Sequence, residues 1–428
     1  MLLLLAVALW TVSRMMPMER GQREALAWLQ EEVQQPGDNA FAALWLLGYE
    51  EVPAAQREAL AMQDVARHRQ LLAALPAEEW GAGVAFESVA SERFRQTEAM
   101  QSPCSWRQPG CLQAVREDAT AVAAALAGQQ ALLARIAELA RYGHHRNLFA
   151  ADPSMPMPPF QLLMRSLPAH ALAHVQGRSD AALAGICNDA TTARMLLAHG
   201  DNLLAAMIGA AMVEGNARLL AEVLAELPLD HPLPATCAGA FAPPAAGELS
   251  ICGAMRGEFD FSRAAIVQSA GRLRWLVLDE DKTLGRMAVG MGWACTREAQ
   301  QALALDEPVA PVPEPTSPWR LECAANAMGC ILADIAAPAY RDYQLRLQDA
   351  GAQLRLAAAL LWLRDQAAGS GDAEDDVAAL LARLPPELTG ARRPFALADD
   401  GRSLQVQRHW RQREPVLSLP LPATLAAP

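Results

Sequence analysis

The chain has 428 residues, of which 52% are hydrophobic, and its formal net charge is -12. This length exceeds what one compact domain usually holds, so we expect one large helical array or two domains. The acidic balance excludes a general electrostatic attraction to nucleic acid or to anionic lipid. Lys282 is the only lysine, and no basic stripe along the chain reverses that balance locally.

The sequence begins with an apolar run from Leu2 to Val12, which only Thr11 interrupts and Arg14 closes. The run is shorter than the roughly 20 residues that cross a bilayer as a helix, and its length suits the core of a signal peptide. No basic residue precedes it, and no small-x-small cleavage site follows it. We therefore interpret residues 1–18 as an uncleaved signal anchor in preference to a cleaved signal peptide. A buried N-terminal helix of a cytosolic protein is the alternative.

Residues 19–305 are predicted to form a helical domain, because apolar residues recur there at helical spacing between Gly and Pro breaks. Residues 228–260, rich in proline and glycine, are predicted to be a loop. The stretches that predict helices are 21–35, 40–47, 53–75, 112–141, 160–176, 180–198, 202–213, 216–227, 261–278 and 283–305. Gly128 is a candidate break within 112–141.

Four of these helices follow one another over residues 160–227, with Gly177, Gly200 and Gly215 between them. The stretch 173–184, Ala-His-Val-Gln-Gly-Arg-Ser-Asp-Ala-Ala-Leu-Ala, resembles the turn of a tetratricopeptide repeat, and 211–222 echoes it more weakly. The aromatic signature positions of that repeat are absent. The resemblance implies stacked helical hairpins, an architecture used mostly for protein binding. Ordinary antiparallel helices would give nearly the same pattern.

The proline-rich segment 306–318 is predicted to be a semi-rigid linker and the best internal boundary. A spacer that runs across the surface of a single domain is the alternative. It precedes a last region, 319–428, which we expect to contain helices, a β-hairpin and a tail. Apolar stretches predict helices over 319–335, 340–366 and 377–384. Two alternating stretches flank Asp400-Gly401, which is the signal of a β-hairpin.

The order of elements in this last region carries a second resemblance. A long helix, a short helix, Leu384-Pro-Pro386, Arg393-Pro-Phe395 and the Asp-Gly turn follow one another. This order is similar to the C-terminal end of several uncharacterised bacterial envelope proteins, although Arg393 stands where aspartate is commoner. As a whole, the chain resembles an uncharacterised proteobacterial envelope family. The resemblance implies a location but no activity.

The eight cysteines are an even number, as expected for an oxidised protein. Three pairs suggest disulfides: Cys104 with Cys111, Cys237 with Cys252, and Cys323 with Cys330. The first two pairs flank loop-like stretches that contain proline and glycine. The third pair would lie roughly 10 Å apart in a continuous helix, so it needs a helix break or other partners. No pair has zinc-ligand or redox Cys-x-x-Cys spacing, and free thiols in the core are the alternative.

Candidate catalytic groups are few. His170 and His174 share a helix face and could both ligate a metal, but the stretch lacks the glutamate of His-Glu-x-x-His hydrolases. We therefore expect packed or surface histidines there. Gly-x-Ser-x-Gly, Ser-x-x-Lys and a glycine-rich phosphate loop are all missing from the sequence. No cofactor is predicted.

These observations predict a mainly α protein, a solenoid-like array of antiparallel helical hairpins with a small C-terminal β-hairpin. We expect it to face the periplasm from the inner membrane or to lie in the periplasm. The expected function is non-catalytic binding of another protein, as a scaffold, accessory factor or inhibitor. One alternative is an enzyme, such as a metal-dependent hydrolase, whose site assembles from His144, His145, His170 and Glu214. Another is a carrier of an apolar ligand held between helices.

Overall fold

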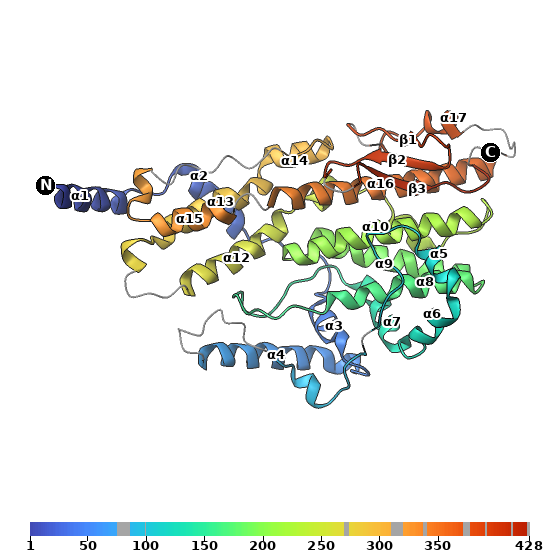
Figure 1. The fold of residues 1–428 in the computed structure, drawn as a ribbon, viewed down its shortest axis with the longest axis horizontal. Coiled ribbons are helices and arrows are strands. Elements are labelled where there is room, and N and C mark those ends of the chain that lie inside the picture. The colour runs from blue at the N-terminus through green and yellow to red at the C-terminus, as the bar shows by residue number, and fades with distance from the viewer. Residues whose placement is uncertain are drawn as a thin grey trace.

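The computed structural model describes residues 1–74, 86–98, 100–268, 274–309, 320–336, 340–370, 377–389, 392–411 and 414–425. This part of the chain is mainly helical and carries one small antiparallel sheet near its C-terminal end (Figure 1), so the predicted mainly α class with a small C-terminal β element is confirmed. Its α-helices are α1 Leu2–Met15, α2 Arg20–Gln30, α3 Phe41–Trp45, α4 Ala54–Ala74, α5 Cys111–Glu117, α6 Ala119–Leu126, α7 Gln130–Ala137, α8 Ser166–Val175, α9 Ser179–His199, α10 Leu203–Glu226, α11 Ala235–Ala240, α12 Cys252–Gln268, α13 Glu280–Gly292, α14 Arg297–Ala304, α15 Ala327–Ala336, α16 Arg341–Ser370 and α17 Val377–Leu381.

Short 3-10 turns connect several of these helices. They are η1 Leu46–Gly48, η2 Val89–Glu92, η3 Glu138–Arg141, η4 Phe160–Arg165, η5 Ala246–Leu249, η6 Arg274–Leu276, η7 Trp293–Cys295 and η8 Leu321–Cys323. The predicted helical stretch 112–141 divides into α5, α6, α7 and η3. The candidate break at Gly128 is observed, since α6 ends just before it and α7 begins just after it, with a bend of 82° between α6 and the α7–η3 segment. The separate break between α5 and α6 was not predicted. The predicted loop 228–260 is also wrong, since α11 and the first half of α12 lie within it.

Helix α10 is the centre of the fold, between α9 on one side and α16 on the other (Figure 1). The Asn202 side chain caps its first turn by accepting a hydrogen bond of 2.9 Å from the amide of Ala205. Gly209 lets α9 approach closely, because a Cβ there would collide with the backbone of Ala193 and Leu197. One continuous hydrophobic core runs from Ala25 to Leu421 and so includes residues on both sides of segment 306–318.

By length and composition, α10 is the one helix in the described part of the chain that could cross a membrane alone, and α6 with α7–η3 passes the same test only as a bent pair. Of the apolar window in α10, 72% is buried inside the protein. Such burial is typical of a core helix, since a helix that is apolar all round needs cover on every side.

The predicted break at Gly215 is wrong, because α10 runs through it without interruption. Glycine is needed there for packing, since a Cβ would lie 2.8 Å from Cδ1 of Trp106. The predicted turn at Gly177 is observed: this glycine has φ +77 and lies between α8 and α9, which form one helical hairpin. The weaker repeat echo at 211–222 is therefore part of a single long helix.

The C-terminal sheet has the strand order β1-β2-β3, with β1 Ala396–Leu397, β2 Ser403–Gln407 and β3 Val416–Pro420, all antiparallel. The predicted hairpin is present between β1 and β2, where Gly401 adopts φ +65. The third strand lies in what was predicted to be a tail. Alternate residues of β2 and β3 are buried, and this face packs against α10 and α16.

Four disulfides join all eight cysteines: Cys104–Cys111, Cys187–Cys237, Cys252–Cys295 and Cys323–Cys330. The predicted pairing of Cys237 with Cys252 is wrong. Cys237 lies in α11 and reaches α9, whereas Cys252 begins α12 and reaches η7. The prediction treated the residues between the two cysteines as one loop, and helices there carry them to different neighbours.

The Cys323–Cys330 disulfide depends on a break in the predicted helix 319–335. Cys323 ends η8, and α15 begins only at Ala327, so the chain turns between them. The two Cα atoms are consequently 6.0 Å apart instead of the roughly 10 Å of a continuous helix.

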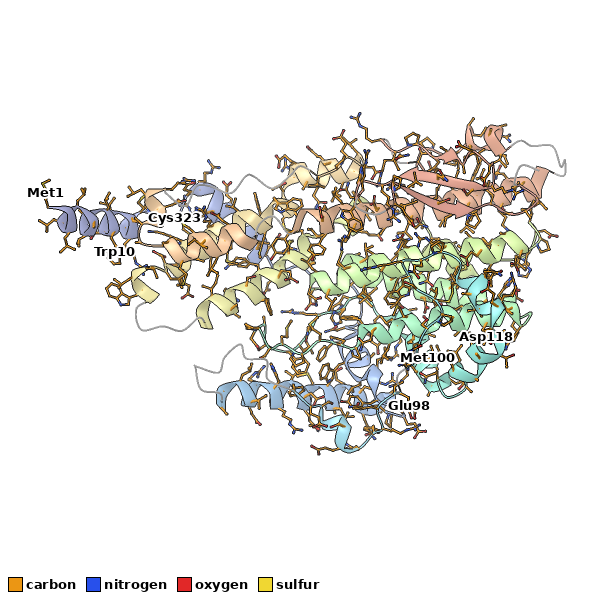
Figure 2. The ribbon with its side chains drawn as sticks, in the orientation of Figure 1. Met1, Trp10, Glu98, Met100, Asp118 and Cys323 are labelled. Atoms are coloured by element: carbon orange, nitrogen blue, oxygen red, sulfur yellow. A yellow bond between two sulfur atoms is a disulfide. The ribbon has the colours of Figure 1, made fainter. Side chains whose placement is uncertain are left out.

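Helix α1 projects from one end of the molecule, and the sheet lies toward the other end (Figure 1). Figure 2 shows Trp10 on this helix and Cys323 near its base. The base is attached by polar contacts. The Ser13 hydroxyl donates to the Glu322 carbonyl and accepts from the Ala325 amide, both at 3.0 Å. The Lys282 ammonium donates to the carbonyls of Ser13 and Arg14 and so caps the last turn of α1.

Candidate functional site

One face of α10 is only partly covered by the rest of the described chain. Over the first half of the helix, the residues that escape full burial recur at helical spacing and so form a single line: Leu204, Met207, Ile208, Ala211 and Glu214. Leu204 is 45% exposed although it lies on the central helix of the core. We call these five residues the α10 stripe.

Two pockets open along the α10 stripe. A polar pocket of about 180 Å³ lies between α10, α16 and the C-terminal segment. An apolar pocket of about 610 Å³ lies between α10, the loop before α5 and residues 157–164. Arg107, Met207 and Ala211 line both pockets, so the two pockets form one groove, which we call the α10 groove.

The apolar end of the groove is built from aromatic, Met and aliphatic side chains. They are Trp106, Met157, Phe160, Met164, Leu204 and Ile208. Trp106 and Phe160 belong to the core, being 5% and 3% exposed, and they fix their part of the wall. Pockets that hold apolar groups have this composition.

The loop that carries Arg107 is held in place at both ends. The Cys104–Cys111 disulfide closes it, and Trp106 within it rests on Gly215 of α10. The Glu222 carboxylate of α10 accepts hydrogen bonds from the amides of Gly110 and Leu112, at 2.9 and 3.0 Å. These contacts present Arg107 from a fixed loop rather than from a free one.

The polar end of the groove is formed by one face of α16. Arg346, Asp349 and Gln353 lie three to four residues apart on this helix and all line the polar pocket. Asp349 accepts from the amide of Trp410 at 3.1 Å, which positions the indole at the pocket. The Arg346 guanidinium lies 4.0 Å from the centre of the Trp410 ring, a cation–π contact.

A buried network of charges supports this end. Asp306 pairs with Arg393 at 2.6 Å and with Arg355 at 2.8 Å, and Asp349 pairs with Arg393 at 2.7 Å. Burial raises the pKa of Asp306, but the hydrogen bond and charge of Arg393 outweigh that effect and lower it overall. Burial raises the pKa of Asp349 despite Arg393. The arginines thus neutralise the carboxylates behind the pocket.

The charged side chains that face the groove, unlike those of the buried network, include arginines without a carboxylate partner in the described part of the chain. Glu214 is engaged by both Arg218 and Arg408. Among the described residues, neither Arg107 nor Arg346 forms an ion pair with a carboxylate. Burial lowers the pKa of Arg346, and the positive charge of Arg107 lowers it further, while the nearby Tyr343 and Asp342 only partly oppose this. The groove therefore has an excess of positive charge at its polar end.

Several buried polar atoms at the polar end lack a hydrogen-bond partner. Gln353 is fully buried, yet neither its amide oxygen nor its amide nitrogen has one. The indole N–H of Trp410, Nε of Arg346 and Nε of Arg408 are also unpartnered. Leaving such a group unsatisfied costs about 1–3 kcal/mol, so their gathering at one pocket suggests a ligand that supplies the partners.

The two histidines predicted to share a helix face do not point at a common site. His170 contacts Asp189 at 3.0 Å, whereas His174 contacts Ser179 at 2.9 Å and Glu226 at 3.1 Å. Within the described ranges, no group of three His, Cys, Asp or Glu side chains is placed to hold a metal ion. The pair stabilises the α8–α9 hairpin through separate polar contacts.

The residues of the alternative enzyme site lie apart. His145 lies 3.4 Å from Asp201 and lines a separate pocket of about 1,040 Å³ beside α12. Glu214 lines the α10 groove, and His144 contacts the carbonyl of Pro36. His170 lines neither pocket. Neither of these two pockets among the described residues therefore contains the whole set.

Apart from Glu214, which the sequence placed in the alternative enzyme site, the groove residues were not predicted from the sequence. They come from the loop before α5, from α10, from α16 and from the segment after β2, which are far apart along the chain. One local signal was present: Arg346, Asp349 and Gln353 are polar residues on one face of a helix whose other residues are largely buried. No known protein family, curated protein or solved structure matches the chain.

Proposed function

We propose that this protein is a non-catalytic helical binding protein, anchored in the inner membrane by α1 and facing the periplasm, and that it binds another protein at the α10 groove. The observation that carries the proposal is the α10 stripe, an accessible line on the central helix of the core. The unpartnered polar atoms at one end of the groove support it, because a bound partner would satisfy them.

The disulfides support the periplasmic part of the proposal. All eight cysteines are paired, and disulfides persist in oxidising compartments such as the periplasm. Two of the four bonds join distant segments, with sequence separations of 50 and 43 residues. Bonds that close long loops stabilise the folded chain most in the chain-entropy description.

The base of α1 supports an anchor that is retained. Ser13 is fully buried and bonded to the segment around Cys323, so removal of α1 would expose these contacts. The Trp10 indole donates to the Leu276 carbonyl at 2.7 Å, and its ring meets that of Trp275 at 5.8 Å. Trp275 is 53% exposed. Paired tryptophans beside an exposed apolar helix are typical of a membrane interface.

The test of the binding site is site-specific photocrosslinking in cells. A photoreactive residue at Met207 in the groove should give one defined protein adduct, and the same probe at Glu58, exposed on α4, should give none of that size. Ala211→Trp, which fills the groove, should abolish the Met207 adduct while thermal unfolding stays close to that of the parent. Adducts of equal intensity from both positions, or an adduct that Ala211→Trp does not reduce, would contradict the proposal.

A second candidate function, carriage of an apolar ligand, is favoured by the apolar end of the groove alone. It predicts that protein extracted under mild conditions carries a stoichiometric lipid or other apolar molecule, visible by native mass spectrometry. Ala211→Trp should remove that molecule. Its absence from the parent protein would leave protein binding as the function of the groove.

A further inference from the structure

We infer that the α10 groove recognises the free C-terminus of a polypeptide that ends in bulky apolar residues. This inference rests on the proposed function and names the chemistry of its partner. Three features of the groove carry it: unpaired cations, a buried amide with both atoms free, and an adjoining apolar pocket.

The first feature selects an anion. Arg107 comes from the disulfide-closed loop and Arg346 from α16, and no carboxylate in the described ranges pairs with either. A guanidinium binds a carboxylate through two parallel hydrogen bonds. The carboxylates already at the pocket, Glu214 and Asp349, are engaged by Arg408 and Arg393, so they do not cancel the two free cations.

The second feature selects a peptide over a fatty acid. Gln353 offers an amide oxygen that needs a donor and an amide nitrogen that needs an acceptor, and both are buried without a partner. The last peptide unit of a chain supplies an N–H and a C=O directly beside the terminal carboxylate. An ionised fatty acid supplies acceptors only and would leave the oxygen of Gln353 unsatisfied. The indole N–H of Trp410 adds one more donor for a peptide carbonyl.

The third feature selects the side chains. Met207 and Ala211 line the polar and the apolar pockets alike, so a chain whose carboxylate meets Arg107 has its last side chains beside the apolar pocket. That pocket holds about 610 Å³ and is walled by residues such as Trp106, Phe160 and Ile208. Capture of a terminal carboxylate with pockets for the preceding side chains is a recurring mode of peptide recognition.

The test uses the full chain in nanodiscs with its disulfides intact. The probe is a pool of fluorescein-labelled hexapeptides with varied apolar residues at their last three positions, each made as the free acid and as the amide. Fluorescence polarisation should select free-acid peptides, and amidation of a selected peptide should weaken its binding about tenfold, since a charge-assisted hydrogen-bond pair is lost.

Two variants make the result specific to the groove. Arg107→Gln changes an exposed residue and should weaken binding of the selected acid about tenfold without changing its amide. Gln353→Leu should weaken acid and amide alike, because it removes the contact with the peptide unit. The matched control is Arg69→Gln, an exposed arginine on α4, which should change neither.

Each remaining outcome has one meaning. Equal binding of acids and amides, or no selected peptide, overturns the inference. Palmitate that binds and depends on Arg107 overturns it in favour of a lipid ligand. If the Met207 crosslink forms but acids are not preferred, the groove binds an internal segment, so the inference fails while the proposed function stands. If the crosslink is also absent, both fail.

Discussion

Helices α1 and α10 are both apolar, but α1 is largely exposed whereas α10 is largely buried. Leu3 and Leu4 of α1 are 78% and 76% exposed, while most of α10 is enclosed by α9, α16 and the sheet. Apolar composition predicts that a helix will be removed from contact with water, but it does not predict which surface will cover the helix. For α10 the cover is the protein itself, except at the stripe. For α1 the described chain covers only the base, which is why we propose a bilayer for the rest.

The largest expected contrast is in core truncation. Leu220→Ala in α10 removes a fully buried side chain and should lower the free energy of unfolding by about 2–5 kcal/mol. Leu4→Ala in α1 should change it by less than about 0.5 kcal/mol, because the side chain is exposed. Urea unfolding of the two variants measures both values. Equal losses would mean that α1 is part of the folded core, and the comparison would fail.

The next contrast concerns how α1 is attached. Lys282→Gln removes the ammonium that caps the last turn of α1 and should cost about 1–2 kcal/mol, since hydrogen bonds to a charged group are lost. The loss should disappear when α1 is deleted in the same background. Thermal unfolding of the single and double variants gives this coupling. If Lys282→Gln lowers the free energy of unfolding equally without α1, the lost contact is the ion pair of Lys282 with Asp279 at 3.5 Å, not the cap of α1.

The sequence predicted the features whose causes are local. The Asp400-Gly401 hairpin, the turn at Gly177 and the Cys104–Cys111 disulfide depend on residues close together in the chain. The errors have long-range causes. Gly215 does not end a helix because Trp106, more than 100 residues away, packs on it, and Cys237 bonds to Cys187 across two helices. The α10 groove was missed for the same reason, since Arg107, Arg346 and Gln353 meet only in the folded chain.

A smaller effect is the dependence of folding stability on pH, which we expect to involve the sheet end of the molecule and not the α1 end. Burial, and then the charge of Arg393, lowers the pKa of His409 below the usual 6.5, and Asp306 and Asp349 only partly oppose this. The unfolded chain therefore binds more protons than the folded chain as pH falls below about 6.5, and stability falls with it. Burial lowers the pKa values of His68 and His199 with the same sign.

His409→Gln should make the loss of stability between pH 7 and pH 5 shallower, because one of the three histidines no longer titrates. The measurement is urea unfolding of parent and variant at both pH values. Leu4→Ala, at the opposite end of the molecule, should retain the parent slope. A variant slope equal to that of the parent would mean that His409 does not contribute to the pH dependence of stability.

The smallest expected change in stability is at Trp275, which contacts Trp10 of α1. This residue tests most directly whether lipid covers that helix. Trp275→Phe should change the free energy of unfolding by less than about 0.5 kcal/mol, because the ring is largely exposed. In nanodiscs with brominated lipids, however, it should reduce the quenched share of tryptophan fluorescence, since tryptophans at an interface contact lipid. Trp28→Phe, the matched change on α2, should not reduce that share, because it removes a ring that we expect to lie away from lipid. Equal quenching in both variants would remove Trp275 from the membrane interface and leave α1 as the only segment for which contact with lipid is proposed.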